Sequence, residues 1–263
     1  MQDRFVGDIG DFGKYGLLNF ICGNGEKSKE RFRLGINWYL FQPELNDKEM
    51  KLDHGKFIKY LKPSRKNDQK KFKICDPHLY CELQKIVDAN KRKVDEIEKI
   101  NILPSGTVFF NKRVSYNDIK GSENKLSYRE SWIEESLNML SSCNLIFYDP
   151  DNGIETGTLQ KHHKKAGKYV FYDEVSKYYN KGKSLIIYNH RSREPEDNYL
   201  KRFRLITERV NINTKIYYLR FHRFNVRDYV FITQERHYEI LLSKVKKFLS
   251  SEWRRHFSGP HFL

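Results

Sequence analysis

The chain has 263 residues, 38% hydrophobic, 32% charged and 14% aromatic, a composition that excludes a disordered chain and can supply one sizeable core. Lysine and arginine outnumber the acids 49 to 34, so the formal charge is +15 and we expect an affinity for polyanions, above all nucleic acid, RNA or DNA. The alternative is a solvated basic surface without a specific ligand.

No stretch approaches the roughly 20 consecutive apolar residues that span a bilayer, so no membrane partner is expected. Residues 1–16 carry acids and glycines where a signal peptide would be apolar, which favours a cytoplasmic protein. The four cysteines form no CxxC pair, so we expect reduced, mostly buried thiols and no cysteine-held metal.

The first elements are expected as follows. Residues 8–16 alternate acids and glycines before an apolar run at residues 17–21, which predicts a helix that begins after a glycine-rich turn. A strand is predicted over residues 34–41. A polar, lysine-rich insert follows over residues 44–71, with one short helix near residues 55–61.

Further along the chain, apolar runs and helical spacings alternate. The expected elements are a strand at 72–75, a helix at 80–99, a strand at 107–110, a helix at 128–140, a strand at 144–148, a helix or strand–helix junction at 168–179, a strand at 184–188, a helix at 199–210, strands at 215–221 and 229–234, and a basic helix at 238–257. This alternation predicts a single Rossmann-like α/β domain over residues 1–263. Its mostly parallel sheet would be covered by helices on both faces and would end in a strand hairpin.

Polar residues directly follow several of these strands, and open α/β sheets bind ligands at that edge. The sharpest signal is Asp149-Pro150-Asp151-Asn152-Gly153, because proline fixes the backbone that holds the first carboxylate. An ordinary turn of the same composition is the alternative. The segment Tyr188-Asn189-His190-Arg191 ends another strand, and Asp76 follows the strand predicted at residues 72–75.

Three segments resemble, in order, the motifs of the bacterial 23S ribosomal RNA adenine methyltransferases. The N-terminal segment keeps the spacing of Gly7, Asp11 and Lys14, with Asp8 in place of the family's asparagine. The segment from Asp76 to Leu83 is similar to the one near the family's ribose-binding acid. The run from Asn144 to Pro150 resembles the strand that leads into the catalytic Asp-Pro-Pro-Tyr.

The resemblance implies a class I fold and S-adenosylmethionine as cofactor. Gly7, Asp8, Asp11 and Lys14 would lie against the cofactor, and Asp76 would hold its ribose. It makes Asp149 the catalytic group, and the strand-end positions add Pro150, Asp151, Asn152 and His190 as candidate catalytic residues. Asp149 would accept a hydrogen bond from the exocyclic amine of a base, and that base must leave its stack to be reached.

The sequence departs from this family at three places. The glycine-rich cofactor loop is absent after residues 34–41, and Asp151 and Asn152 replace the second proline and the stacking tyrosine. The position that matches the ribose-binding acid is Ile74, with Asp76 two residues later. These departures favour a second form of the hypothesis, in which the protein is a catalytically altered relative of these enzymes.

Two other classes stay open. A metal-dependent nuclease or phosphoesterase would gather strand-end acids around Mg²⁺ or Mn²⁺, with candidates Asp8, Asp11, Asp149, Asp151, Asp173, Glu174 and His190. A binding module without chemistry would use the basic segments 202–209 and 244–255, with Phe203, Trp253 and Phe257 as stacking rings.

Arg191, Arg193 and Arg202 are the predicted nucleic-acid contacts, since arginines at the sheet edge can meet a phosphate or a base. For Arg191 the alternative is a structural ion pair with Glu194 or Glu196.

Overall fold

A computed structural model describes residues 1–23, 32–41, 57–62, 66–210, 212–213 and 215–263. Its helices are α1 (Ile9–Cys22), α2 (Lys66–Lys73), α3 (Pro77–Asp88), α4 (Val94–Lys99), α5 (Ser122–Met139), α6 (Tyr172–Asn180), α7 (Glu196–Val210) and α8 (Glu235–Ser250). Its strands are β1 (Leu34–Asn37), β2 (Val108–Phe110), β3 (Leu145–Tyr148), β4 (Gly153–Ile154), β5 (Tyr169–Val170), β6 (Ser184–His190), β7 (Tyr217–Phe221), β8 (Arg227–Ile232) and β9 (Phe257–Phe262).

Seven of these strands form one mixed sheet in the order β2-β1-β3-β6-β8-β7-β9. Strands β2, β1, β3 and β6 pair in parallel. Strand β8 lies antiparallel between β6 and β7, and β9 pairs antiparallel with β7. The Rossmann-like sheet with a C-terminal hairpin is therefore confirmed, including the antiparallel strand inserted beside the parallel ones.

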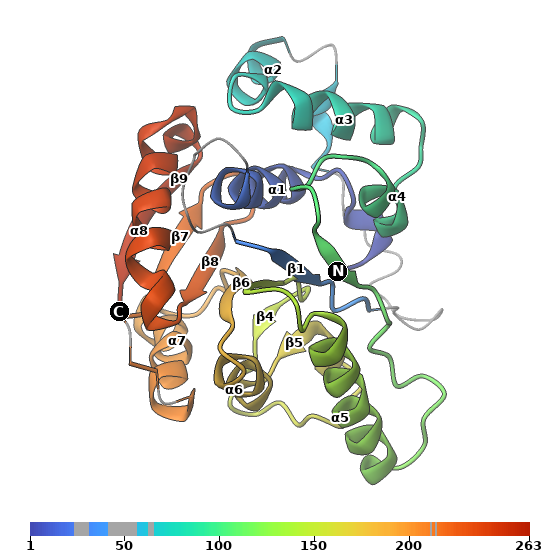
Figure 1. The fold of residues 1–263 in the computed structure, drawn as a ribbon. Helices are drawn as coiled ribbons and strands as arrows, with labels where there is room; N and C mark the ends of the chain where they lie inside the picture. The colour runs from blue at the N-terminus through green and yellow to red at the C-terminus, as the bar shows by residue number, and fades with distance from the viewer. Residues whose placement is uncertain (24–31, 42–56, 63–65, 211, 214) are drawn as a thin grey trace.

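Helices cover both faces of the sheet (Figure 1). Side chains alternate along β3, so Leu145 and Phe147 join the core beneath α1, α3 and α8, while Ile146 and Tyr148 join the core beneath α5, α6 and α7. All four are fully buried. Burial on both faces explains why this strand appears in the sequence as a continuous apolar run.

Gly10, Gly13 and Gly16 lie inside α1 and do not form the turn that the sequence predicts over residues 8–16. Asp8 caps the helix, its carboxylate accepting from the backbone N–H groups of Gly10 and Asp11, so α1 begins at Ile9. The glycines permit close packing: a Cβ on Gly16 would lie 2.1 Å from the Trp253 ring, and one on Gly13 would lie 2.9 Å from Phe221.

Three further predictions are wrong. The helix predicted over residues 80–99 is interrupted, because α3 ends at Asp88 and α4 begins at Val94. Residues 72–75, predicted as a strand, contain the end of helix α2, because one buried ring, Phe72, in a lysine-rich segment does not define a period. The predicted helix over residues 238–257 ends at Ser250, and the edge strand β9 follows. Gly259 and a cis Pro260 lie within β9 and argue against a strand in the sequence. Of the polar insert at 44–71, residues 44–56 and 63–65 lie outside the described part of the chain.

Candidate active site

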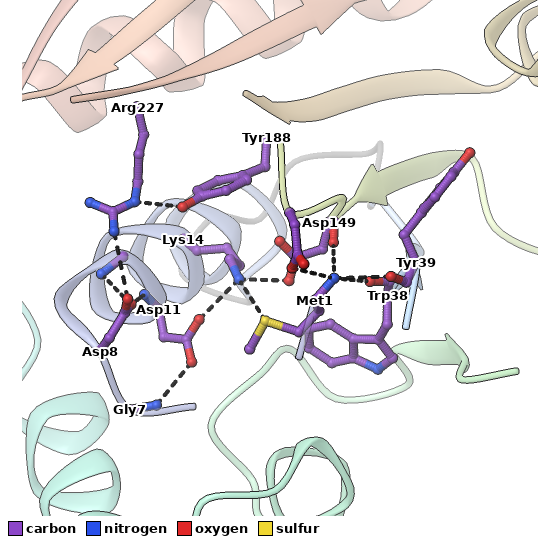
Figure 2. A network of polar contacts seen from close by, with 12 residues as sticks. Met1, Gly7, Asp8, Asp11, Lys14, Trp38, Tyr39, Asp149, Tyr188 and Arg227 are labelled. Carbon is purple, nitrogen blue, oxygen red and sulfur yellow. Dashed lines mark hydrogen bonds and ion pairs between the residues drawn. The ribbon is translucent and has the colours of Figure 1, made fainter. Parts of the chain in front are cut away.

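The candidate site lies where the parallel strands end and helix α1 crosses their carboxyl edge. Asp149 directly follows β3, and its backbone N–H donates to the carbonyl of Asn37, the last residue of β1, at 3.0 Å. Asp11 and Lys14 lie one turn apart on α1, on the side that faces this edge (Figure 2). The prediction that Asp149 lies at this edge of the sheet is thus confirmed.

Lys14 joins two carboxylates that are far apart in the sequence. Its Nζ lies 2.6 Å from Asp149 Oδ2 and 2.9 Å from Asp11 Oδ1. The other oxygen of Asp11 accepts the backbone N–H of Gly7 at 3.0 Å. Asp11, Lys14 and Asp149 are at most 2% exposed, so water screens these charges poorly.

Burial and charge oppose each other in this group. Burial raises the pKa of Asp11 to about 6, although the ammonium of Lys14 acts to lower it. Burial alone would lower the pKa of Lys14, but Asp11 and Asp149 offset this and hold it above its usual value. Lys14 is therefore a fixed cation at neutral pH.

The first residue of the chain occupies the centre of the site. The α-ammonium of Met1 donates to the carbonyl oxygens of Trp38 at 2.9 Å, Tyr39 at 3.0 Å and Asp149 at 2.8 Å, and it lies 3.2 Å from Asp151 Oδ1 (Figure 2). These acceptors, which we call the ammonium cage, come from the ends of β1 and β3. The cage shows that this edge can hold a buried ammonium group.

The Met1 thioether and Asp151 complete the contacts of the N-terminal segment. Met1 Sδ lies 3.8 Å from Lys14 Nζ. The side chain of Gln2 donates to Asp151 Oδ2. Burial alone would raise the pKa of Asp151, but the Met1 ammonium and Gln2 outweigh it and hold that pKa below its usual value.

Tyr188 and Arg227 close the site on the β6 and β8 side. Lys14 Nζ lies 5.1 Å from the centre of the Tyr188 ring, and Arg227 Nε donates to the Tyr188 hydroxyl. Arg227 also lies 3.6 Å from Asp8 Oδ2, so it ties the start of α1 to the sheet. His190 lies 3.3 Å from the Tyr188 hydroxyl through Nε2. Burial, with the Arg227 charge, lowers the pKa of His190 to about 3, so its ring is neutral at pH 7.

The turn after β3 is held by β6. The backbone N–H of His190 donates to the Asn152 carbonyl at 3.3 Å, and Asn189 Oδ1 accepts the backbone N–H of Ile154 at 2.7 Å. Gly153 has φ +106°, and a Cβ there would lie 1.9 Å from Asn189 Oδ1. A glycine is required at this position, and the backbone of the Asp149-Pro150 turn is thereby fixed.

Asp76 has a different setting from the one predicted. It follows helix α2 and caps α3, its carboxylate accepting the backbone N–H of Leu79 at 2.9 Å. The Asp-Pro step reflects a helix N-terminus. The strand-end position on which the ribose role depends is therefore wrong.

The predicted nucleic-acid arginines are largely engaged with acids. Arg191 Nη2 lies 2.7 Å from Glu196, and its guanidinium lies 4.3 Å from the centre of the Tyr199 ring. Arg202 forms an ion pair with Glu194. The alternative of a structural ion pair is confirmed for Arg191. Arg193 is exposed.

Two of the acids that the nuclease hypothesis requires lie away from the edge that carries Asp11, Asp149 and Asp151. Asp173 is exposed and pairs with Lys161, whereas Glu174 is 1% exposed and lies 2.5 Å from Arg129 Nε beneath the opposite face. Within the described residues, no three histidine, cysteine or acidic side chains are arranged to hold a metal ion.

Of the four free thiols, Cys143 is buried and the other three are half-buried.

Some residues of this site could not be found from the sequence. Arg227 lies in a hairpin without a motif, and the cage depends on backbone carbonyls, which carry no sequence signal.

The rings proposed for stacking in the binding-module hypothesis are buried, namely Phe203, Trp253 and Phe257. That part of the hypothesis is wrong.

The chain matches no known protein-family model. Comparison with curated proteins found no significant relative. In the described part of the chain, no helix combines the length and apolar character that crossing a bilayer requires.

Proposed function

We propose that this protein is an S-adenosylmethionine-dependent methyltransferase, or a catalytically altered relative of one, that acts on an amine of a nucleic acid base. The contact between Lys14 and Asp149, 2.6 Å apart although 135 residues separate them, carries this proposal. It supports the shared site that the motif order implies, at the sheet edge where open α/β folds bind ligands.

The groups at this edge fit the methionine part of the cofactor. Met1 carries a primary ammonium and a thioether, and S-adenosylmethionine presents the same ammonium beside a sulfonium. The ammonium cage of Trp38, Tyr39, Asp149 and Asp151 would therefore hold the cofactor's ammonium. Binding in this position requires the first residues of the chain to move out of the cage.

When bound, the cofactor supplies an electrophilic methyl group on sulfur. Asp149 would accept a hydrogen bond from the substrate amine and orient the nitrogen lone pair toward that methyl group. Lys14 keeps the Asp149 carboxylate in place through Oδ2, and the proline that follows limits the backbone freedom of the turn. His190, 3.3 Å from the Tyr188 hydroxyl, lies at the same edge; its lowered pKa keeps the ring neutral, so it can exchange hydrogen bonds there without carrying a charge.

Nucleic acid is the partner that the charge favours. A formal charge of +15 attracts a polyanion, and this attraction weakens steeply with salt because counterions are released on binding. An affinity that does not change with salt would argue against this partner.

The direct experiment measures transfer of tritiated methyl groups from S-adenosylmethionine to total RNA and to DNA. We expect counts in one of these substrates, inhibition by S-adenosylhomocysteine and no loss of activity in EDTA. Asp149→Asn should abolish transfer, whereas the matched control Asp173→Asn, at a side chain 54% exposed, should retain it. Equal transfer by wild type and a folded Asp149→Asn protein would refute the assignment.

A further inference from the structure

The turn between β7 and β8 carries an exposed aromatic ring. Phe224 lies in residues 222–226 and is 60% exposed, and its φ of +55° is uncommon for a residue with a side chain. This turn lies at the carboxyl edge of the parallel strands, because β8 starts at Arg227 opposite His190, the last residue of β6. The exposed ring is therefore on the side of the sheet that carries Asp149.

Arg227 ties this turn to the candidate site. Its Nη1 donates to the carbonyls of Asn225 at 2.7 Å and Arg223 at 3.3 Å, while its other nitrogens contact Asp8 and Tyr188. Arg227 is 2% exposed. Backbone strain at an exposed residue persists only where the surroundings enforce it, and Arg227 provides such a constraint.

A second ring supports Phe224 from below. Phe57 stacks on it with ring centres 4.9 Å apart and an angle of 28° between the planes. The Phe57 carbonyl accepts the backbone N–H of Ile9, the first residue of α1, at 3.1 Å. The stacked pair is therefore anchored beside Asp8, at the margin of the Lys14 site.

Basic residues extend from this pair over the neighbouring surface. Arg223 donates to the ring of His256 and to the carbonyl of Arg255, and His256 contacts the carbonyl of Lys71 at the end of α2. The exposed cations of this basic face are Lys70, Lys71, Lys73, Arg254 and Arg255. Acids lie beside these cations too: Glu252 is paired with Arg255 at 2.7 Å, and Asp76 is engaged in capping α3.

We propose that Phe224, supported by Phe57, stacks on an unpaired base of a single-stranded nucleic acid whose phosphates follow the basic face. This inference rests on the nucleic-acid part of the proposed function and names the form of that substrate. A flat exposed ring contacts the face of a base, which a duplex covers with the next base pair, while the surrounding cations offset the phosphate charge. The ring also supplies an aromatic surface that the Asp149 turn lacks.

Fluorescence anisotropy with short labelled single-stranded RNA and DNA tests this assignment. Phe224→Ala should weaken binding roughly 5- to 150-fold, the range that corresponds to losing one base stack. Phe224→Leu should weaken it similarly because it keeps apolar volume without a flat π-face, and Phe224→Tyr should restore it. The matched control is Phe262→Ala, which removes a ring that is 50% exposed. Phe262 pairs with Tyr217, at the other end of β7 from the Phe224 turn. This variant should bind like wild type.

Binding of S-adenosylhomocysteine to the same proteins separates this inference from the proposed function. Cofactor binding with equal oligonucleotide affinity for wild type and Phe224→Ala overturns the stacking role and leaves the proposed function standing. If Phe224→Ala weakens oligonucleotide binding but no protein binds the cofactor, the stacking role is supported and the proposed methyltransferase function is refuted. Tighter binding of duplex than of single strands, unchanged in Phe224→Leu, also overturns the proposal.

Discussion

Replacing Lys14 by methionine tests the buried charge group at the centre of the site. The change keeps most of the side-chain volume and removes an ammonium that lies 2.6 Å and 2.9 Å from two carboxylates at most 2% exposed. Removing one partner of a buried ion pair typically costs about 3–5 kcal/mol, because the remaining charge has neither water nor a counterion. We expect a loss of this size in the free energy of unfolding, measured by urea denaturation near neutral pH.

The loss should depend on pH. Burial raises the pKa of Asp11 to about 6 against an ordinary 3.8, even though Lys14 lowers it, and without Lys14 this pKa should rise further. The folded state then holds a proton that the unfolded chain releases, so the contribution of Asp11 to stability is largest below about pH 4 and is lost as the pH rises through its folded pKa. The Lys14→Met penalty should therefore be smaller at about pH 5 than at about pH 7.5.

An exposed pair with the same geometry provides the control. Lys85 lies 2.6 Å from Glu82, but its side chain is 71% exposed, so Lys85→Met should change stability little. A Lys14→Met protein that loses no more stability than Lys85→Met, or that loses the same amount at both pH values, would refute a buried, unscreened charge group.

Three further predictions follow from the contacts. Glu174→Gln should lower the free energy of unfolding by about 3–5 kcal/mol in urea denaturation, because it weakens the buried pair with Arg129. Binding of S-adenosylhomocysteine should stay unchanged, and altered binding would show that Glu174 contributes to the cofactor site. Asp76→Ala should lower stability by about 1 kcal/mol through loss of the α3 cap without changing cofactor affinity, and a large drop in affinity would support the ribose role. Burial lowers the pKa of His190 to about 3, so stability should be lost as the pH falls from about 6.5 toward 3; denaturation across this range should show a flatter profile for His190→Gln, and an unchanged profile would contradict a neutral buried ring.

The sequence predicts those parts of the fold in which burial leaves a clear pattern. Strands β3 and β6 are apolar over most of their length because both faces are covered, and their ends bring Asp149 and His190 to one edge. Residues 72–75 fail this test, since Phe72 anchors a polar helix to the core through a single ring.

The contacts within the site are harder to predict from the sequence than the position of the site. Spacing along one helix puts Asp11 and Lys14 on the same face, and the strand-end rule adds Asp149. The Arg227 contacts depend on the register of an antiparallel pair, and the ammonium cage depends on backbone carbonyls. A single sequence specifies neither of these.

Isothermal titration of the wild-type protein with S-adenosylhomocysteine tests the central claim most directly. The cage and the Lys14 group predict saturable binding of one ligand per chain. Absence of heat and of competition with S-adenosylmethionine at millimolar ligand would contradict a methyltransferase site at Asp149.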